Sequence, residues 1–112
     1  ASILFVMFSD FDQTARRKQP AELLDYLNSY FTKFDNICAH HKVTKIETVG
    51  EEYVCAVGVV PNDWKVEETM GHGVILHGLI KAATEMLQVQ EDSEVRLKMG
   101  IHTGPVVAGV IG

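Results

Sequence analysis

The chain has 112 residues, a length that favours one folded domain. Its 46% hydrophobic and 22% charged residues are typical of globular proteins. The net charge of −5 argues against a nucleic-acid-binding protein, which would need a basic surface. Because no run of about 18 apolar residues is present, we also expect no direct membrane contact from this segment. Both cysteines, Cys38 and Cys55, lie in apolar patterns that predict buried free thiols.

The first part of the chain predicts a strand followed by a helix. Residues 2–9 form a continuous apolar run, as expected of a strand that is covered on both faces. The polar segment 10–19 follows, and we interpret its basic run (R-R-K) as a solvated approach to a helix, with a phosphate-binding patch as the alternative. Pro20 suits a first helical position, and apolar residues then recur every three or four positions to about residue 40. This spacing predicts an amphipathic helix.

The rest of the chain alternates between predicted strands and a second helix. We expect strands over 43–49 and 53–60, a helix over 68–88, and strands over 95–101 and 106–111. The strand at 53–60 is almost entirely apolar and should be central in its sheet. A break is expected at 61–63 (P-N-D) and a turn at 102–105. The glycines of the second helix allow either close packing on the sheet or a later helix start. This order predicts an α+β fold, a ferredoxin-like β-α-β-β-α-β core with an antiparallel sheet.

Three carboxylates gather in the predicted hairpin between the second and third strands. Glu47 lies in its first strand, and Glu51 and Glu52 lie at or beside a tight turn at Gly50-Glu51. On residue types alone, this pattern is that of a solvated turn.

Three segments carry a family resemblance. They are P-A-E-L-L-D-Y-L-N-S-Y-F-T-K-F-D at 20–35, K-I-E-T-V-G-E-E-Y at 45–53 and I-H-T-G-P-V-V-A-G-V-I-G at 101–112. Together they resemble the class III nucleotidyl cyclase catalytic domain, the domain of adenylyl and guanylyl cyclases. The resemblance spans the whole chain and implies an α/β sandwich that continues past Gly112 with strands carrying an asparagine and an arginine. We therefore expect 1–112 to be a single cyclase-domain fragment that lacks its C-terminal strands.

The resemblance also implies a reaction. Cyclases of this family are dimers with active sites at the subunit interface. The ribose 3′-hydroxyl of a nucleoside triphosphate attacks the α-phosphate, and pyrophosphate leaves. Two divalent cations, Mg²⁺ or Mn²⁺, activate the hydroxyl and hold the phosphates, and two aspartates of the family bind them.

The metal positions of the family are altered in this sequence. In the ungapped register that leads to Pro20, the first family aspartate maps to Met7, whose thioether is a poor ligand for magnesium. A rival register with a three-residue deletion before Pro20 would make Asp10 the ligand. The second aspartate maps to Glu51, a carboxylate that is one methylene longer and could still reach a metal. We therefore expect a partner domain to bind most of the metal.

Glu47 maps to the position from which the family reads the purine, a lysine in adenylyl and a glutamate in guanylyl cyclases. Guanine presents two donors, N1–H and the 2-amino group, which one carboxylate can accept, whereas adenine presents an acceptor at N1. Thr48 and Gly50 belong to the same matching motif and are grouped with Glu47 as substrate-binding residues. The alternative is an exposed glutamate paired with Lys45 or Lys98.

A degraded metal position beside a retained base-reading residue resembles the metal-poor half of a heterodimeric guanylyl cyclase of the protozoan type. On this hypothesis the chain helps to convert GTP to cyclic GMP and pyrophosphate but is inactive alone. It would belong to the cytoplasmic part of a larger integral membrane protein. The alternative is an inactive cyclase-homology domain that dimerises and regulates. An unfinished sheet leaves open a homodimer of the fragment itself.

Overall fold

The computed structural model describes residues 1–9, 11–91 and 96–104, with no account of the side chains of Thr14 and Glu91. In chain order the elements are β1 (Ser2–Phe8), α1 (Phe11–Arg17), α2 (Pro20–His40), β2 (Thr44–Val49), β3 (Glu52–Val57), α3 (Pro61–Met70), α4 (His72–Glu91) and β4 (Leu97–Thr103).

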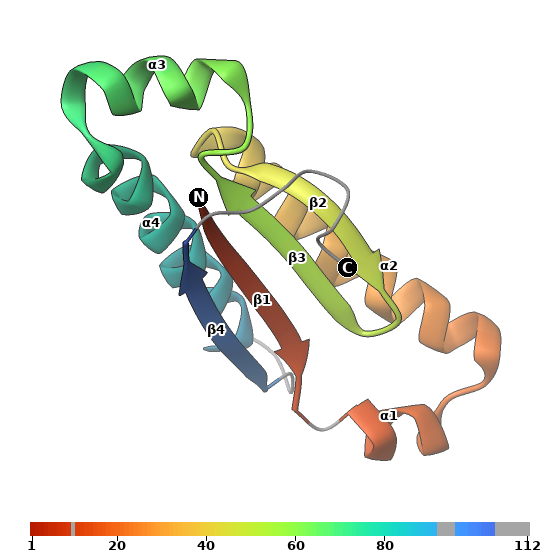
Figure 1. The fold of residues 1–112 in the computed structure, drawn as a ribbon. Coiled ribbons are helices and arrows are strands. Elements are labelled where there is room, and N and C mark those ends of the chain that lie inside the picture. The colour runs from red at the N-terminus through yellow and green to blue at the C-terminus, as the bar shows by residue number, and fades with distance from the viewer. Residues whose placement is uncertain (10, 92–95, 105–112) are drawn as a thin grey trace.

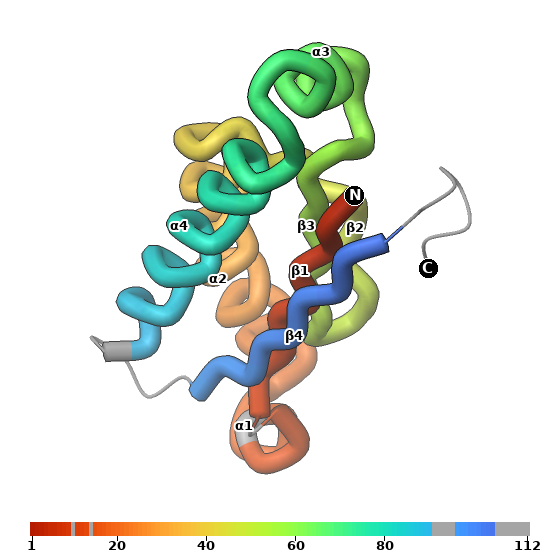
Figure 2. The backbone as a smooth tube through the Cα atoms, turned by 60° about the vertical axis from the view of Figure 1, so that its left-hand side comes forward, coloured from red at the N-terminus to blue at the C-terminus, as the bar shows by residue number. Residues whose placement is uncertain are grey.

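The strands form one antiparallel sheet in the order β2-β3-β1-β4. Helix α2 connects β1 to β2, and α3 with α4 connects β3 to β4, so two split β-α-β units interlock. Helices α2 and α4 cover one face of the sheet, which we call the helix face (Figure 1). Figure 2 shows these two layers edge-on. This arrangement confirms the predicted ferredoxin-like α+β fold, with the apolar strand β3 in the interior of the sheet.

The main core lies between the helix face and the two long helices. Leu4, Val6 and Phe8 alternate along β1 toward the helices, and the Phe8 ring packs against four aromatic rings of α2. Most of the rest of this core is buried apolar side chains of α2, β3 and α4: Leu27, Tyr30, Phe31, Phe34, Cys38, Tyr53, Cys55, Val57, Leu79, Ala82, Ala83 and Met86. The predicted apolar faces of both helices are confirmed, and both cysteines are buried free thiols.

The opposite face of the sheet, here the open face, carries no helix in the described part of the chain (Figure 1). A small cluster of Ile3, Val54 and Ala56 is buried there, with Phe5 and Ile46 partly buried beside it. Exposure on β1 rises from 5% at Ile3 to 37% at Met7. The prediction that this strand is covered on both faces therefore holds only at its beginning, since no described element lies over its far end.

Two segments that were predicted to be irregular are helical. Residues 11–17, within the predicted polar segment, form α1, in which Phe11 packs against the core and two arginines occupy the last turn. Seven residues are too few to show an apolar period, but the arginines suit the negative end of the helix dipole. The predicted break at 61–63 begins α3, with Pro61 at the first helical position as Pro20 is in α2.

The second long helix starts later than predicted because Gly71 ends α3. Its φ of 85° and ψ of 166° lie in a region that only glycine adopts readily. Gly78 has the other expected role, close packing, since a Cβ there would lie 3.3 Å from the carbonyl oxygen of His41. The predicted turn at 102–105 is wrong at its start, because His102 and Thr103 extend β4. The predicted strand at 106–111 lies outside the described residues.

A buried polar chain joins the sheet to α3 and α4. The fully buried Ser2 hydroxyl lies 2.7 Å from His72 Nε2 and 2.8 Å from Thr103 Oγ1. His72 Nδ1 in turn lies 2.9 Å from Glu67 Oε1. Ser2 is therefore satisfied in the interior and ties β1 to β4 and α4.

Replacing Gly71, at the end of α3, and Gly73, in α4, by alanine should change the free energy of unfolding in opposite directions. A Cβ added at either position would meet no atom within 4 Å, so packing is not at issue. Gly71→Ala should lower the free energy of unfolding by about 1–3 kcal/mol, because alanine resists this backbone conformation. Gly73→Ala, inside α4, should raise it by about 0.5–1 kcal/mol. Urea denaturation of both variants checks this, and equal effects would contradict the assigned helix break.

Candidate functional site

The hairpin turn places Glu51 at the tip of β2 and β3. Val49 pairs with Glu52, so Gly50 and Glu51 form a two-residue turn, as predicted. Gly50 has a φ of 58°, and a glycine at the first of two turn positions is the signature of a type II′ turn. This turn matches the twist of the strands and fixes the register of the hairpin.

A β-bulge at Ile46 interrupts β2. Lys45 pairs with Cys55 and Glu47 pairs with Val54, so Ile46 is the extra residue. Cys55 belongs to the main core under the helices, whereas Val54 belongs to the open-face cluster. Lys45 and Glu47 therefore lie on opposite faces, although residues two apart in a regular strand share one face. Ile46 packs on the open face with Val54.

On the helix face, Lys45 meets a carboxylate of α2. Lys45 Nζ lies 3.1 Å from Asp35 Oδ1, and the Tyr53 hydroxyl donates to the same oxygen at 2.7 Å. Tyr53 is fully buried, whereas the Asp35 and Lys45 side chains are 43% and 42% exposed. Burial, and next the acceptor Asp35, raise the pKa of the Tyr53 phenol far above its usual range. Tyr53 is thus a permanent donor that orients Asp35.

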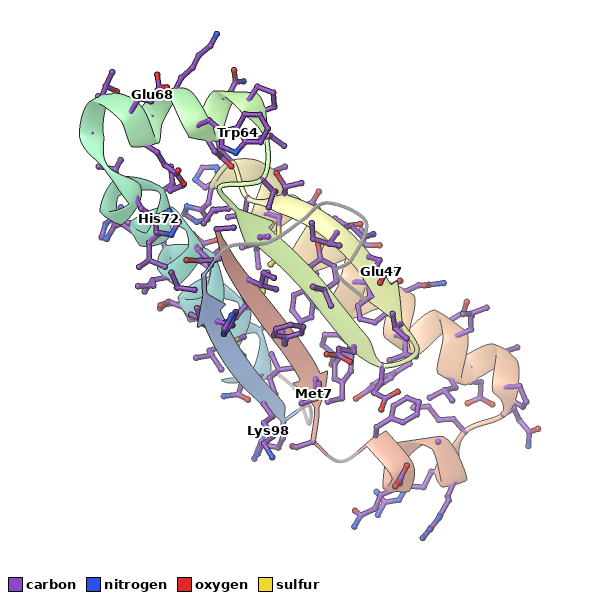
Figure 3. All side chains as sticks on the ribbon, viewed as in Figure 1. Met7, Glu47, Trp64, Glu68, His72 and Lys98 are labelled. Carbon is purple, nitrogen blue, oxygen red and sulfur yellow. The ribbon has the colours of Figure 1, made fainter. Side chains whose placement is uncertain are left out.

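Glu47 is exposed on the open face and has no ion pair within the described residues. Lys45 is held on the other face by Asp35. Lys98 lies on β4, three strand spacings or roughly 14 Å across the sheet. Figure 3 shows this separation, with Lys98 beside Met7 and Glu47 on the far strand. The alternative in which Glu47 pairs with Lys45 or Lys98 therefore finds no support in the geometry.

The other predicted substrate residues lie apart from Glu47. Thr48 pairs with Tyr53, whose side chain is on the helix face, so Thr48 is on the opposite side from Glu47. Gly50 lies in the turn. Of this group, Glu47 alone is brought to the open face.

Met7, the position that the resemblance assigns to the first family aspartate, carries a thioether and no oxygen ligand. Met7 is on the open face between Glu52 of β3 and Lys98 of β4, so its neighbours include a cation (Figure 3). The rival ligand, Asp10, lies outside the described residues. No group of three or more potential ligands (His, Cys, Asp or Glu) gathers in the part of the chain that the structure describes. Of the two metal positions that the resemblance implies, the described residues therefore supply an oxygen ligand at Glu51 alone.

A cleft of about 360 Å³ separates the end of β1 and α1 from the hairpin tip, lined by Phe8, Ser9, Phe11, Asp12, Gln13 and Glu51. Asp12 joins Glu51 there, and sequence reasoning missed it because α1 was not predicted. The described lining holds two carboxylates and no cation. Such a lining repels a triphosphate unless a cation from elsewhere accompanies it.

The chain matches the family model of the adenylate and guanylate cyclase catalytic domain over residues 1–112. It belongs to this family. The resemblance found in the three sequence segments is thereby confirmed.

Individual relatives agree with this membership. The receptor-type guanylate cyclase gcy-27 of Caenorhabditis elegans is 34% identical over 115 residues, which cover 100% of this chain and 15% of that protein. Retinal guanylyl cyclase 2 of Rattus norvegicus is 34% identical over 113 residues, or 98% of this chain and 10% of that protein. The chain thus spans only a small part of the length of these relatives. None of the helices that the structure describes is long and apolar enough to cross a bilayer.

Solved cyclase domains have the same fold. The guanylate cyclase domain of RhGC from Catenaria anguillulae, in complex with GTP, gives a TM-score of 0.76 at 22% identity and covers 99% of this chain and 59% of that one. A non-canonical dimeric guanylyl cyclase domain from Blastocladiella emersonii gives 0.76 at 21% identity, covering 98% and 60%. This chain thus spans about three fifths of the length of each solved domain.

Tyr53 should stay protonated as long as the protein is folded. Its pKa is raised above the usual value of about 10, so the stability linked to its protonation is present below about pH 10 and is lost at higher pH. Ultraviolet absorbance titration of the folded protein and of Tyr53→Phe should give the same phenolate signal near pH 10. A larger signal in the unsubstituted protein would contradict the buried Tyr53–Asp35 bond.

Proposed function

We propose that this chain is the guanine-recognising half of a guanylyl cyclase that converts GTP to cyclic GMP and pyrophosphate beside a second cyclase domain. The observation that carries the proposal is the Glu47 carboxylate, exposed on the open face and without an ion pair in the described residues. Such a carboxylate can accept hydrogen bonds from both N1–H and the 2-amino group of guanine. Each charge-assisted bond contributes about 1.5–3 kcal/mol, which is enough to select a base.

The surroundings of Glu47 suit a purine. Ile46, Val54 and Phe5 form an apolar surface on the same face, against which a flat ring can lie while its polar edge meets the carboxylate. The relatives named above are guanylyl cyclases, and the Catenaria domain was crystallised with GTP. We therefore propose GTP as the substrate.

A second cyclase domain would cover the open face. Apolar side chains remain exposed there, Met7 at 37% and Val49 at 55%, and an exposed apolar sheet face favours association. In the register that leads to Pro20, a homodimer of this chain would bring Met7 to both positions of the first family aspartate. The partner is therefore proposed to be an unlike cyclase domain whose two aspartates bind Mg²⁺ or Mn²⁺, as the family resemblance implies.

The chain is also proposed to be one part of a longer protein. We infer that residues 1–112 are part of one cyclase domain, since the solved domains are longer. The receptor-type relatives support a place in the cytoplasmic part of a larger membrane protein.

A second candidate function is an inactive cyclase-homology domain that dimerises and regulates. Met7 with Lys98 beside it favours this candidate, because neither side chain holds a divalent cation. The two candidates differ in whether the assembly with a metal-bearing domain turns over GTP.

Turnover should require the partner. The chain alone, supplied with GTP and Mn²⁺, should make no cyclic GMP, because Met7 brings a thioether in place of the oxygen ligand that the resemblance implies. The full-length protein assembled with a metal-bearing cyclase domain should make cyclic GMP, measured by product chromatography. An inactive assembly that still dimerises would favour the regulatory candidate, and turnover by the chain alone would contradict the half-site assignment.

Base selection should depend on Glu47. In the assembled enzyme, Glu47→Lys should lower the preference for GTP over ATP by at least about tenfold, which corresponds to the loss of roughly 1.4 kcal/mol of discrimination. The readout is kcat/KM for each nucleotide. Glu52→Gln, a carboxylate change one strand away on the same hairpin, is the matched control and should keep the preference. Unchanged selectivity in Glu47→Lys would show that this residue does not read the base.

A further inference from the structure

The bulge at Ile46 separates a lysine from the proposed base reader. In the structure Lys45 pairs with Cys55 on the helix face, and Glu47 pairs with Val54 on the open face. The extra residue, Ile46, makes this possible by breaking the alternation of β2. Glu47 therefore lies on the open face, whereas Lys45, the lysine nearest to it in sequence, lies on the other face of the sheet.

A regular hairpin would undo this separation. Paired without a bulge from the same turn, β2 would place Ile46 opposite Cys55 and Lys45 opposite Ala56. Ala56 belongs to the open-face cluster, so Lys45 would share that face with Glu47, roughly 7 Å away along the strand. At that spacing the ammonium reaches the Glu47 carboxylate. The bulge also keeps the apolar Ile46 beside Glu47 in place of the cation.

One carboxylate of α2 holds the two sides of the bulge together. Asp35 Oδ1 lies 3.1 Å from Lys45 Nζ, which precedes the bulge. The same oxygen accepts a 2.7 Å hydrogen bond from Tyr53, which pairs with Thr48 on the turn side of the bulge. Tyr53 is fully buried, so its hydroxyl is held by packing and orients Asp35, which in turn contacts Lys45.

We propose that Asp35 is a positioning residue for base selection, because it keeps Lys45 on the helix face and leaves the Glu47 carboxylate uncompensated. The inference rests on the proposed role of Glu47 in reading guanine. Without the Asp35 contact the bulge loses the carboxylate that holds its two sides, and β2 can pair in the regular register. On the open face the lysine would bind the Glu47 carboxylate and would offer a donor to N1 of adenine. Loss of the Asp35 contact should therefore lower the preference for GTP over ATP, beyond any effect on overall activity.

The test measures kcat/KM for GTP and for ATP in the full-length protein assembled with its metal-bearing partner. Asp35→Asn keeps the shape of the side chain but removes the charge that pairs with the ammonium. It should lower the GTP/ATP ratio about fivefold, the effect expected for loss of a partly exposed ion pair with a buried neighbour. Asp35→Asn combined with Lys45→Met removes the released cation and should restore the ratio to within about twofold of the starting protein.

Two further variants are controls. Glu85→Gln changes a polar contact of similar length between the end of α2 and α4, in which His41 Nε2 lies 2.8 Å from Glu85 Oε1, and should leave the ratio unchanged. Glu47→Gln should lower the ratio on its own, because it removes the charge of the proposed base reader.

Each result bears on the inference. Equal losses for both nucleotides in Asp35→Asn, or no recovery with Lys45→Met, would overturn it, because Asp35 would then act only on stability. An unchanged ratio in Asp35→Asn beside a clear loss in Glu47→Gln would overturn this inference alone. An unchanged ratio in Glu47→Gln would overturn the proposed function, and this inference with it.

Discussion

The pairing of β2 with β3 is the constraint on which the candidate site depends. The turn at Gly50-Glu51 sets the register from one end, and the bulge at Ile46, inside β2, shifts the register by one residue for Lys45 and Thr44. Together they decide which side chains the open face receives. Glu47 and Ile46 reach that face, while Lys45 turns toward α2 and meets Asp35. If the pairing of β2 with β3 shifted by one residue on either side of the bulge, other side chains of β2 would lie on the open face. The sequence would be the same, but that surface would carry different charges.

The core explains why this hairpin can keep an irregular strand. Tyr53 and Cys55 of β3 are fully buried under α2, and Tyr53 contacts Phe31 and Phe34 through its ring and Asp35 through its hydroxyl. The strand next to the bulge is thus held by packing on the helix face. The open face, free of helices in the described residues, carries the exposed and chemically distinct side chains. Stability and the proposed recognition are divided between the two faces of one sheet.

Sequence patterns were sufficient for the elements with a long apolar period. The faces of α2 and α4 and the interior position of β3 follow from spacing alone, as does the turn at Gly50. The short helix α1 was missed because seven residues carry no period, and with it Asp12, which lines the same cleft as Glu51. The bulge could not be predicted either, because K-I-E-T-V reads as a regular strand. Only the pairing partners, Cys55 and Val54, reveal that Lys45 and Glu47 lie on opposite faces.

Guanine recognition by this chain, with the metals bound by another domain, would be visible in a crystal structure of the assembled pair with a GTP analogue that lacks the 3′-hydroxyl. We expect the guanine N1 and 2-amino nitrogens within about 3 Å of the Glu47 carboxylate, with both cations bound by carboxylates of the partner domain. A guanine bound away from β2, or cations held at the Met7 end of β1, would contradict this division of roles.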